Sequence, residues 1–151
     1  MSGLDAMLAL SAAHEEETGP LDDAKLTHML GSAFHTATAD AGADGFLITF
    51  DQSSDYDGVN FKWFVERYTK FVYIDRVIVA PHARGRGLAR SFYEGLFDRA
   101  RDAGHDRVGC EINSDPPNPG SMAFHAALGF FEVGVAALEN GKTVSYQMRM
   151  L

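Results

Sequence analysis

Several features are scarce in this chain of 151 residues, and each absence excludes a class of protein. It has one cysteine, Cys110, so an internal disulfide is impossible and no cysteine-based metal cluster is expected. No apolar run reaches the length of about 18 residues that a membrane-spanning helix needs. The first residues have no basic segment before their apolar part, so we expect no secretory signal peptide. These absences favour a cytoplasmic protein with no membrane partner and no metal.

Basic residues are scarce in the first part of the chain. Residues 1–61 hold eleven acids and one base, whereas residues 62–151 hold twelve bases and ten acids. The formal net charge of -8 argues against a nucleic-acid partner, which would need a broad basic face. The acidic part is either a solvated surface or a region that attracts a cationic substrate.

The pattern of apolar residues predicts one mixed α/β domain over residues 1–151. The clearest part is a βαβ unit, with a strand at 71–80, an amphipathic helix at 88–103 and a parallel strand at 107–113. Asn118 is expected to cap a further helix, with Pro119 at its first position. The other expected elements are helices at 4–15 and 19–34, hairpins at 35–51 and 130–150, and a loop with a helical turn at 52–70.

The segment between this strand and helix holds three arginines, two glycines and no acid in seven residues, 84–90. The first N–H groups of a helix lack internal partners and carry partial positive charge, so they attract anions. Glycines let the backbone approach a phosphate, and guanidinium groups add charge-assisted hydrogen bonds. The pattern predicts a polyphosphate site, and a merely solvated turn is the alternative. It is neither a Walker loop nor a dinucleotide fingerprint, because no Gly-Lys-Ser/Thr follows and Arg90 replaces the third glycine.

Two segments resemble the GNAT superfamily of acetyl-CoA-dependent N-acetyltransferases. Residues 84–89 match the Arg/Gln-x-x-Gly-x-Gly/Ala signature of its motif A, which here covers about 71–103. Motif B covers about 107–131. The residues that match motif B are Asn118, Phe124, Gly129 and Phe130. The resemblance implies a mixed, mostly antiparallel sheet that is splayed between two parallel central strands and flanked by helices. GNAT chains usually begin with a strand, and none is expected here before residue 34.

The same resemblance implies the activity and the coenzyme site. An acetyl group would move from acetyl-CoA, bound in the splay, to a primary amine by direct attack through a tetrahedral intermediate. The coenzyme pyrophosphate would rest on the turn, and its pantetheine arm would pair with the first strand of the βαβ unit. The residues implied for the coenzyme are Val77, Ile78, Val79, Arg84, Gly85, Arg86, Gly87, Leu88, Ala89, Arg90, Asn118, Ser121 and Phe124. The alternatives are a non-catalytic acyl-CoA sensor and a nucleotide-binding module.

Three residues are candidates for proton transfer. His125 stands where many members carry tyrosine, and an ordinary imidazolium with a pKa of about 6.5 would protonate a thiolate readily. Its alternatives are a helix residue without catalytic role and a pantetheine contact. Glu111 and Asp75 are the candidate bases. Some members have a catalytic glutamate at the position of Glu111, and Asp75 is expected to share a face with Val77. The alternative for Asp75 is an ion pair with Arg76 or Arg107. The alternative for Glu111 is a carboxylate with a structural partner. Water could also deprotonate the amine, so that neither residue acts as the base.

The acceptor is expected to be a small primary amine or an amino-acid derivative that enters past residues 51–70, and a protein N-terminus or lysine is the alternative. This segment is rich in aromatic and acidic side chains. We expect Tyr56, Trp63 and Phe64 to line the acceptor site, where aromatic faces can bind a cation. The alternative is that these rings pack against the sheet. Exposed sheet edges leave a homodimer possible.

Overall fold

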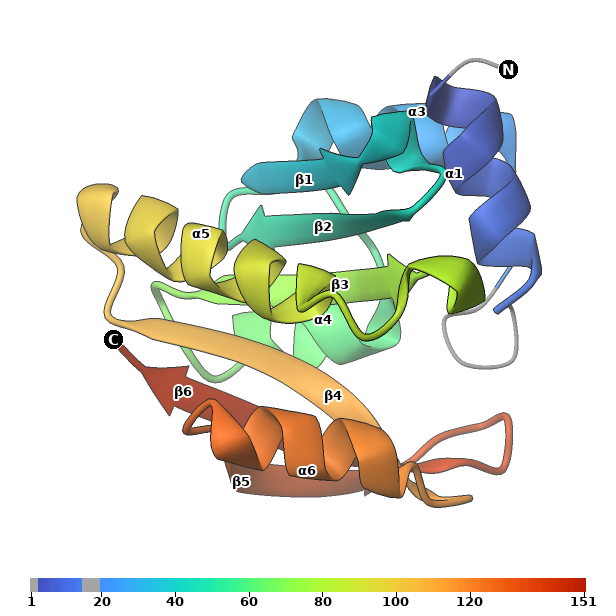
Figure 1. The fold of residues 1–151 in the computed structure, drawn as a ribbon. Helices are drawn as coiled ribbons and strands as arrows, with labels where there is room; N and C mark the ends of the chain where they lie inside the picture. The colour runs from blue at the N-terminus through green and yellow to red at the C-terminus, as the bar shows by residue number, and fades with distance from the viewer. Residues whose placement is uncertain (1–2, 15–19) are drawn as a thin grey trace.

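The computed structural model describes residues 3–14 and 20–151 and shows a six-stranded sheet flanked by helices (Figure 1). Its strands lie in the order β1-β2-β3-β4-β6-β5, with β3 and β4 parallel and the other neighbours antiparallel. The expected mixed sheet with two parallel central strands is therefore confirmed. In chain order the elements are α1 (Gly3–Ala12), α3 (Asp23–Ser32), β1 (His35–Ala39), η1 (Asp40–Gly42), β2 (Gly45–Asp51), α4 (Val59–Val65), β3 (Val72–Val79), η2 (Pro81–Ala83), α5 (Leu88–Asp102), β4 (Arg107–Asp115), α6 (Pro119–Ala127), β5 (Phe131–Ala137) and β6 (Thr143–Met150).

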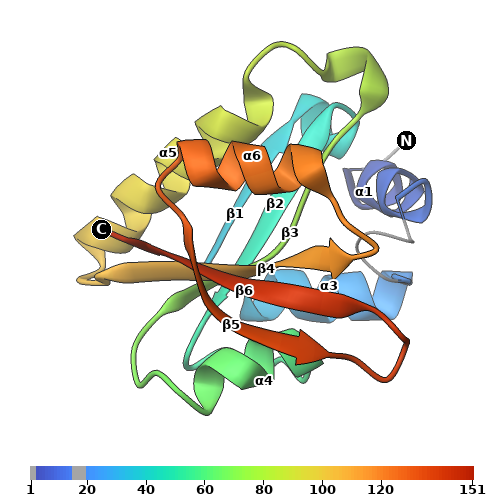
Figure 2. The same cartoon turned by 90° about the horizontal axis from the view of Figure 1, so that it is seen from below.

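Helices cover both faces of the sheet, with α5 and α6 on one face and α3 and α4 on the other (Figure 2). The expected stripe of α5 is buried against the sheet at Phe92, Leu96 and Ala100. On the opposite face, Leu26 of α3 and Phe64 of α4 are fully buried. Burial of each such side chain stabilises the fold by about 1.5–3 kcal/mol. No helix within residues 3–14 and 20–151 has the length and apolar character needed to cross a bilayer.

The helix boundaries follow local signals in the sequence. The side chain of Asn118 caps α6 by accepting a hydrogen bond from the Ser121 N–H at 3.3 Å, and Pro119 begins the helix. Gly129 follows the helix with a φ of 89°. The expected helix at 4–15 is α1, which ends at Ala12, and residue 15 lies outside the described residues. Within those residues the first strand begins at residue 35, as expected.

The two parallel strands separate soon after they meet. β3 and β4 pair at Val72↔Val108 and Tyr73↔Gly109 and then diverge, because β3 continues along β2 and β4 continues along β6. A bulge in β3 accompanies this divergence, since β2 pairs with Ile74 and then with Arg76. The expectation that Asp75 shares a face with Val77 was wrong, because the bulge interrupts the alternation of side chains.

Candidate active site

A cavity of about 500 Å³ lies where β3 and β4 diverge. Its walls come from both strands, from α6, from the segment before α4 and from the β5–β6 turn. Seven residues singled out from the sequence line it: Tyr56, Asp75, Val77, Glu111, Asn118, Ser121 and His125. The splayed sheet therefore brings residues from four separate segments to one site.

Glu111 is held at the cavity wall by neutral hydrogen-bond donors. The Tyr73 hydroxyl donates to Glu111 Oε2 at 2.6 Å, and the nearby Asn60 side chain also favours the charged form of this carboxyl group. The Tyr146 hydroxyl in turn donates to Asn60 Oδ1 at 2.8 Å. Burial raises the pKa of Glu111 to about 8, although the hydrogen bond from Tyr73 favours the charged form. Sequence reasoning missed Tyr73, Asn60 and Tyr146, because only the fold brings them to Glu111.

Asp75 forms an ion pair inside the protein. Its Oδ2 atom lies 2.8 Å from Arg76 Nε, and the side chains of the two residues are 6% and 3% exposed. Arg76 Nη1 also donates to the Ser11 hydroxyl of α1 at 3.2 Å. The structure therefore favours the ion-pair alternative for Asp75, with Arg76 as the partner. Burial and the charge of Asp75 raise the pKa of the neighbouring Tyr56 hydroxyl.

His125 is buried, and both of its ring nitrogens have partners. Nδ1 lies 2.8 Å from the Ser121 carbonyl oxygen, so Nδ1 carries the proton and donates it. Nε2 then accepts from the Tyr93 hydroxyl at 2.7 Å. Burial lowers the pKa of His125 and so favours the uncharged ring. The expected role of His125 as general acid assumed an imidazolium with an ordinary pKa, and the lowered pKa argues against that role.

The arginine-glycine turn has an open backbone. Gly85 and Gly87 adopt φ values of 82° and 74°, which glycine allows at little cost. A Cβ atom at either glycine would meet no atom of the described chain within 4 Å. Gly87 is the N-cap of α5 and forms no side-chain cap, so the first N–H groups of this helix remain available to a ligand.

The three arginines of the turn have partners within the chain. Arg84 Nη2 donates to His14 Nε2 at 3.2 Å, and Arg90 Nε lies 2.9 Å from Glu94 Oε1. Arg86 Nη1 lies 3.4 Å from Asp44 Oδ2. These arginine side chains are exposed, and exposed ion pairs contribute only about 0–1 kcal/mol, so a polyphosphate can compete for them.

Three other expected site residues lie in packed aromatic groups. Trp63 stacks on Tyr146 with ring centroids 4.1 Å apart, and Phe64 is fully buried. Phe124 meets the Tyr93 ring edge-on at 5.3 Å. This placement favours packing as the role of Trp63 and Phe64. Among the described residues, no group of three His, Cys, Asp or Glu side chains is arranged to hold a metal ion.

Comparison with known proteins adds independent information. Residues 28–130 match the model of the acetyltransferase (GNAT) family. The chain is 30% identical over 131 residues to aminoglycoside N(6')-acetyltransferase type 1 of Serratia marcescens, covering 85% of this chain and 86% of the relative. The solved structure of Ard1 from Thermoplasma volcanium has a TM-score of 0.77 at 12% identity and covers 99% and 91% of the two chains. An aminoglycoside 6'-N-acetyltransferase solved with coenzyme A has a TM-score of 0.68 at 12% identity and covers 97% and 89%.

Proposed function

Because the chain belongs to the acetyltransferase (GNAT) family, we propose that it moves the acetyl group of acetyl-CoA to a primary amine of a small molecule. The observation that carries this proposal is the position of Glu111, whose pKa is raised to about 8, in the cavity between the diverging strands. A carboxyl group that titrates near neutral pH inside a cavity is suited to take a proton from a substrate.

The coenzyme fits the arginine-glycine turn and the cavity beside it. The pyrophosphate would bind the open N–H groups at the start of α5, where Gly85 and Gly87 leave room for it. The pantetheine arm would follow β3 from Val77 to Val79. Asn118 uses its side-chain oxygen as the α6 cap, so its amide NH₂ group is the part that would contact this arm.

Glu111 is proposed as the general base. Its carboxylate would accept a proton from the substrate ammonium, and the free amine would then attack the thioester carbonyl. The tetrahedral intermediate would collapse by breaking the C–S bond, and its nitrogen would lose the second proton to solvent. A backbone N–H of β3 near Val77 would donate to the oxyanion that develops on this carbonyl. Tyr73 and Asn60 would fix the orientation of the Glu111 carboxyl group, while Asp75 is engaged with Arg76 and serves the structure of the site.

His125 is proposed as a wall of the coenzyme site rather than as the acid. It lines the cavity, but burial lowers its pKa and so disfavours the imidazolium form that a general acid would need. Thiols have pKa values above neutral, so the thiolate of the leaving coenzyme can be protonated from solvent.

An acceptor with more than one amino group suits the charge of the site. The relative from Serratia marcescens is named for acetylation of aminoglycosides, which carry several amines. In this chain the exposed acids Asp55 and Asp57 flank Tyr56, which lines the cavity. Within the cavity, Asp75 is already paired with Arg76, so the attraction comes from the acids beside it. Acids in and around a cleft attract a polycation by their combined field.

A panel of amines tests the proposal. Release of free thiol from acetyl-CoA would be followed with aminoglycosides, linear polyamines and single amino acids as acceptors. We expect the fastest turnover with an aminoglycoside or polyamine. Binding of acetyl-CoA without transfer to any amine would instead support an acyl-CoA sensor, and absence of coenzyme binding would contradict the proposal as a whole.

A further inference from the structure

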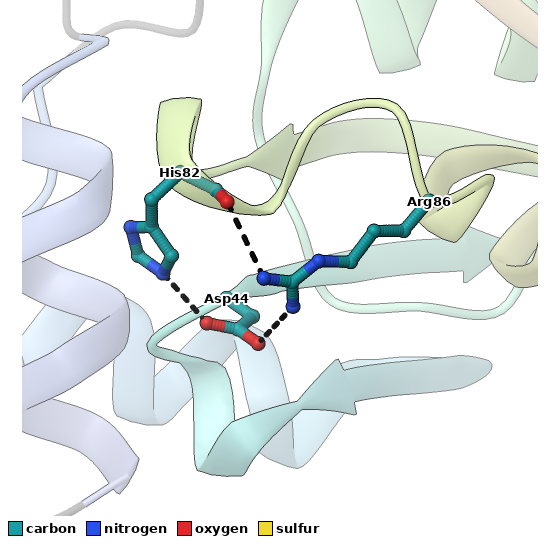
Figure 3. A network of polar contacts seen from close by, with 3 residues as sticks. All are labelled: Asp44, His82 and Arg86. Atoms are coloured by element: carbon teal, nitrogen blue, oxygen red, sulfur yellow. Dashed lines mark hydrogen bonds and ion pairs between the residues drawn. The ribbon is translucent and has the colours of Figure 1, made fainter.

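One acidic side chain lies against the arginine-glycine turn. Asp44 stands immediately before β2, in the turn that joins β1 to β2. Figure 3 shows both of its carboxylate oxygens directed toward the turn that follows β3. Oδ1 lies 2.7 Å from His82 Nε2, and Oδ2 lies 3.4 Å from Arg86 Nη1.

Asp44 contacts this turn at three places along its length. Its backbone oxygen accepts a hydrogen bond from the Ala80 N–H at 2.9 Å, where β3 ends. Its carboxylate reaches His82 in η2 and Arg86 just before α5. Arg86 Nη2 also donates to the His82 carbonyl oxygen at 3.4 Å, which closes the network (Figure 3). A single residue thereby connects the end of β3, η2 and the approach to α5.

The rest of the turn offers little packing to hold it. Ala83 is fully buried and fixes the middle of the turn. Beyond it, Gly85 and Gly87 are exposed, and the space that a Cβ would occupy is open within the described chain. Ordering one backbone residue costs about 1–2 kcal/mol of conformational free energy. A contact that orders these residues before the coenzyme arrives lowers the cost of binding.

We propose that Asp44 is a positioning residue for the coenzyme, acting through His82 and Arg86 to hold the pyrophosphate-binding turn in its open form. This inference rests on the proposed function, since it assumes that the turn binds acetyl-CoA. Asp44 is a paired carboxylate, 20% exposed, while its partners His82 and Arg86 are 65% and 58% exposed. Coenzyme phosphates can therefore take over Arg86 while the bond between Asp44 and His82 persists.

The charge of Asp44 and its positioning role predict opposite changes in acetyl-CoA affinity when the residue is removed. The direction of the measured change therefore tests the inference. A negative charge beside a polyphosphate repels it, so removing Asp44 would tighten coenzyme binding if the residue had no positioning role. With a positioning role, Asp44→Ala raises KM for acetyl-CoA, by about tenfold if roughly 1.4 kcal/mol of pre-ordering is lost. Asp44→Asn keeps an oxygen that can accept from His82, so its effect is smaller.

The experiment measures steady-state kinetics and acetyl-CoA titrations for wild type, Asp44→Ala, Asp44→Asn and His82→Ala. We expect KM for acetyl-CoA to rise while kcat and KM for the amine stay within about twofold, a difference of only about 0.4 kcal/mol. A general loss of stability would not produce this split. In the double variant Asp44→Ala/His82→Ala, the loss of acetyl-CoA affinity should be smaller than the sum of the two single losses. Both substitutions remove the same contact between Asp44 and His82.

Asp98→Asn is the matched control, because Asp98 forms an exposed ion pair with Arg101 on the outer side of α5. It should leave KM for acetyl-CoA unchanged. An unchanged or lower KM in both Asp44 variants would overturn the inference while leaving the proposed function intact. Absence of coenzyme binding by the wild type would instead contradict the proposed function. If Asp44→Ala fails to fold, Asp44→Asn decides: a higher KM for acetyl-CoA supports the inference, and an unchanged or lower KM overturns it.

Discussion

The Tyr73 hydroxyl lies 2.6 Å from Glu111 Oε2, although the two residues are 38 positions apart. Tyr73 belongs to the short stretch in which β3 and β4 pair, and Glu111 lies on β4 two residues after the partner of Tyr73. This contact therefore stands at the point where the sheet begins to open. It places a hydrogen-bond donor on the Glu111 carboxyl group, and burial raises the pKa of this group to about 8.

Glu111→Gln should reduce kcat strongly while acetyl-CoA still binds. A positioned general base contributes about 10²–10⁴-fold to rate, and glutamine cannot accept the proton. In the wild type, kcat/KM for the amine should rise with pH through a pKa of about 8, because the active carboxylate becomes more populated. The rate profile of the variant should lack this limb. An unchanged kcat would remove Glu111 from the mechanism.

Tyr73→Phe separates the titration of Glu111 from that of the substrate amine. The Tyr73 hydrogen bond lowers the pKa of Glu111, so its loss should move the rising limb of the rate profile to higher pH. The amine pKa in solution does not change with this substitution. A limb that stays at the wild-type pH would show that the amine, and not Glu111, is being observed.

Glu111 should also make stability depend on pH. Its pKa is about 8 in the folded protein against a reference value of 4.5, so the folded state binds more protons between these values. The free energy of unfolding should therefore fall as pH rises through this window and level off above it. Glu111→Gln should remove this contribution. Thermal unfolding at about pH 5 and about pH 9 would show a smaller loss of Tm in the variant than in the wild type, and an equal loss would contradict the raised pKa.

Asp75→Asn should destabilise the protein through Arg76. Both side chains are almost fully buried, and breaking a buried ion pair by removing one partner costs about 3–5 kcal/mol. Urea unfolding would measure this change. Asp98→Asn, in an exposed pair, should cost less than about 1 kcal/mol. Equal effects of the two substitutions would mean that the Asp75–Arg76 pair is not buried in solution.

The sequence predicted those parts of the fold that local signals determine. The βαβ unit follows from apolar periodicity and from a glycine-rich turn, and the start of α6 follows from Asn118 and Pro119. The bulge at Asp75 could not be predicted, because it depends on how β2 pairs with β3.

The site was predicted only in part, because local sequence signals do not show which distant segments the fold brings together. Glu111 and the turn are visible as residues in a motif, whereas the partners that tune them come from distant segments. Tyr73 reaches Glu111 only because two strands are adjacent, and Asp44 reaches Arg86 only because the β1–β2 turn lies beside η2. The burial that lowers the pKa of His125 is likewise a property of packing, which a reference pKa does not contain.

His125→Phe tests the revised view of this residue. If the ring only shapes the cavity, kcat should fall by less than about tenfold, below the range of a general acid. The Tyr93 hydroxyl would lose its acceptor, which should destabilise the protein by about 1–3 kcal/mol. A fall in kcat of about 10²-fold or more with intact coenzyme binding would restore the role of acid.

The central claim is that the arginine-glycine turn binds acetyl-CoA. Isothermal titration calorimetry of the wild-type protein with acetyl-CoA tests it most directly, with Gly87→Val as the matched variant. Gly87 has a φ of 74°, where a β-branched residue is strained, and its substitution would distort the open turn. We predict one acetyl-CoA site per chain, with a Kd below about 1 mM, the upper end of usual KM values, and much weaker binding by the variant. Absence of binding by the wild type at millimolar acetyl-CoA, or equal binding by both proteins, would contradict the account.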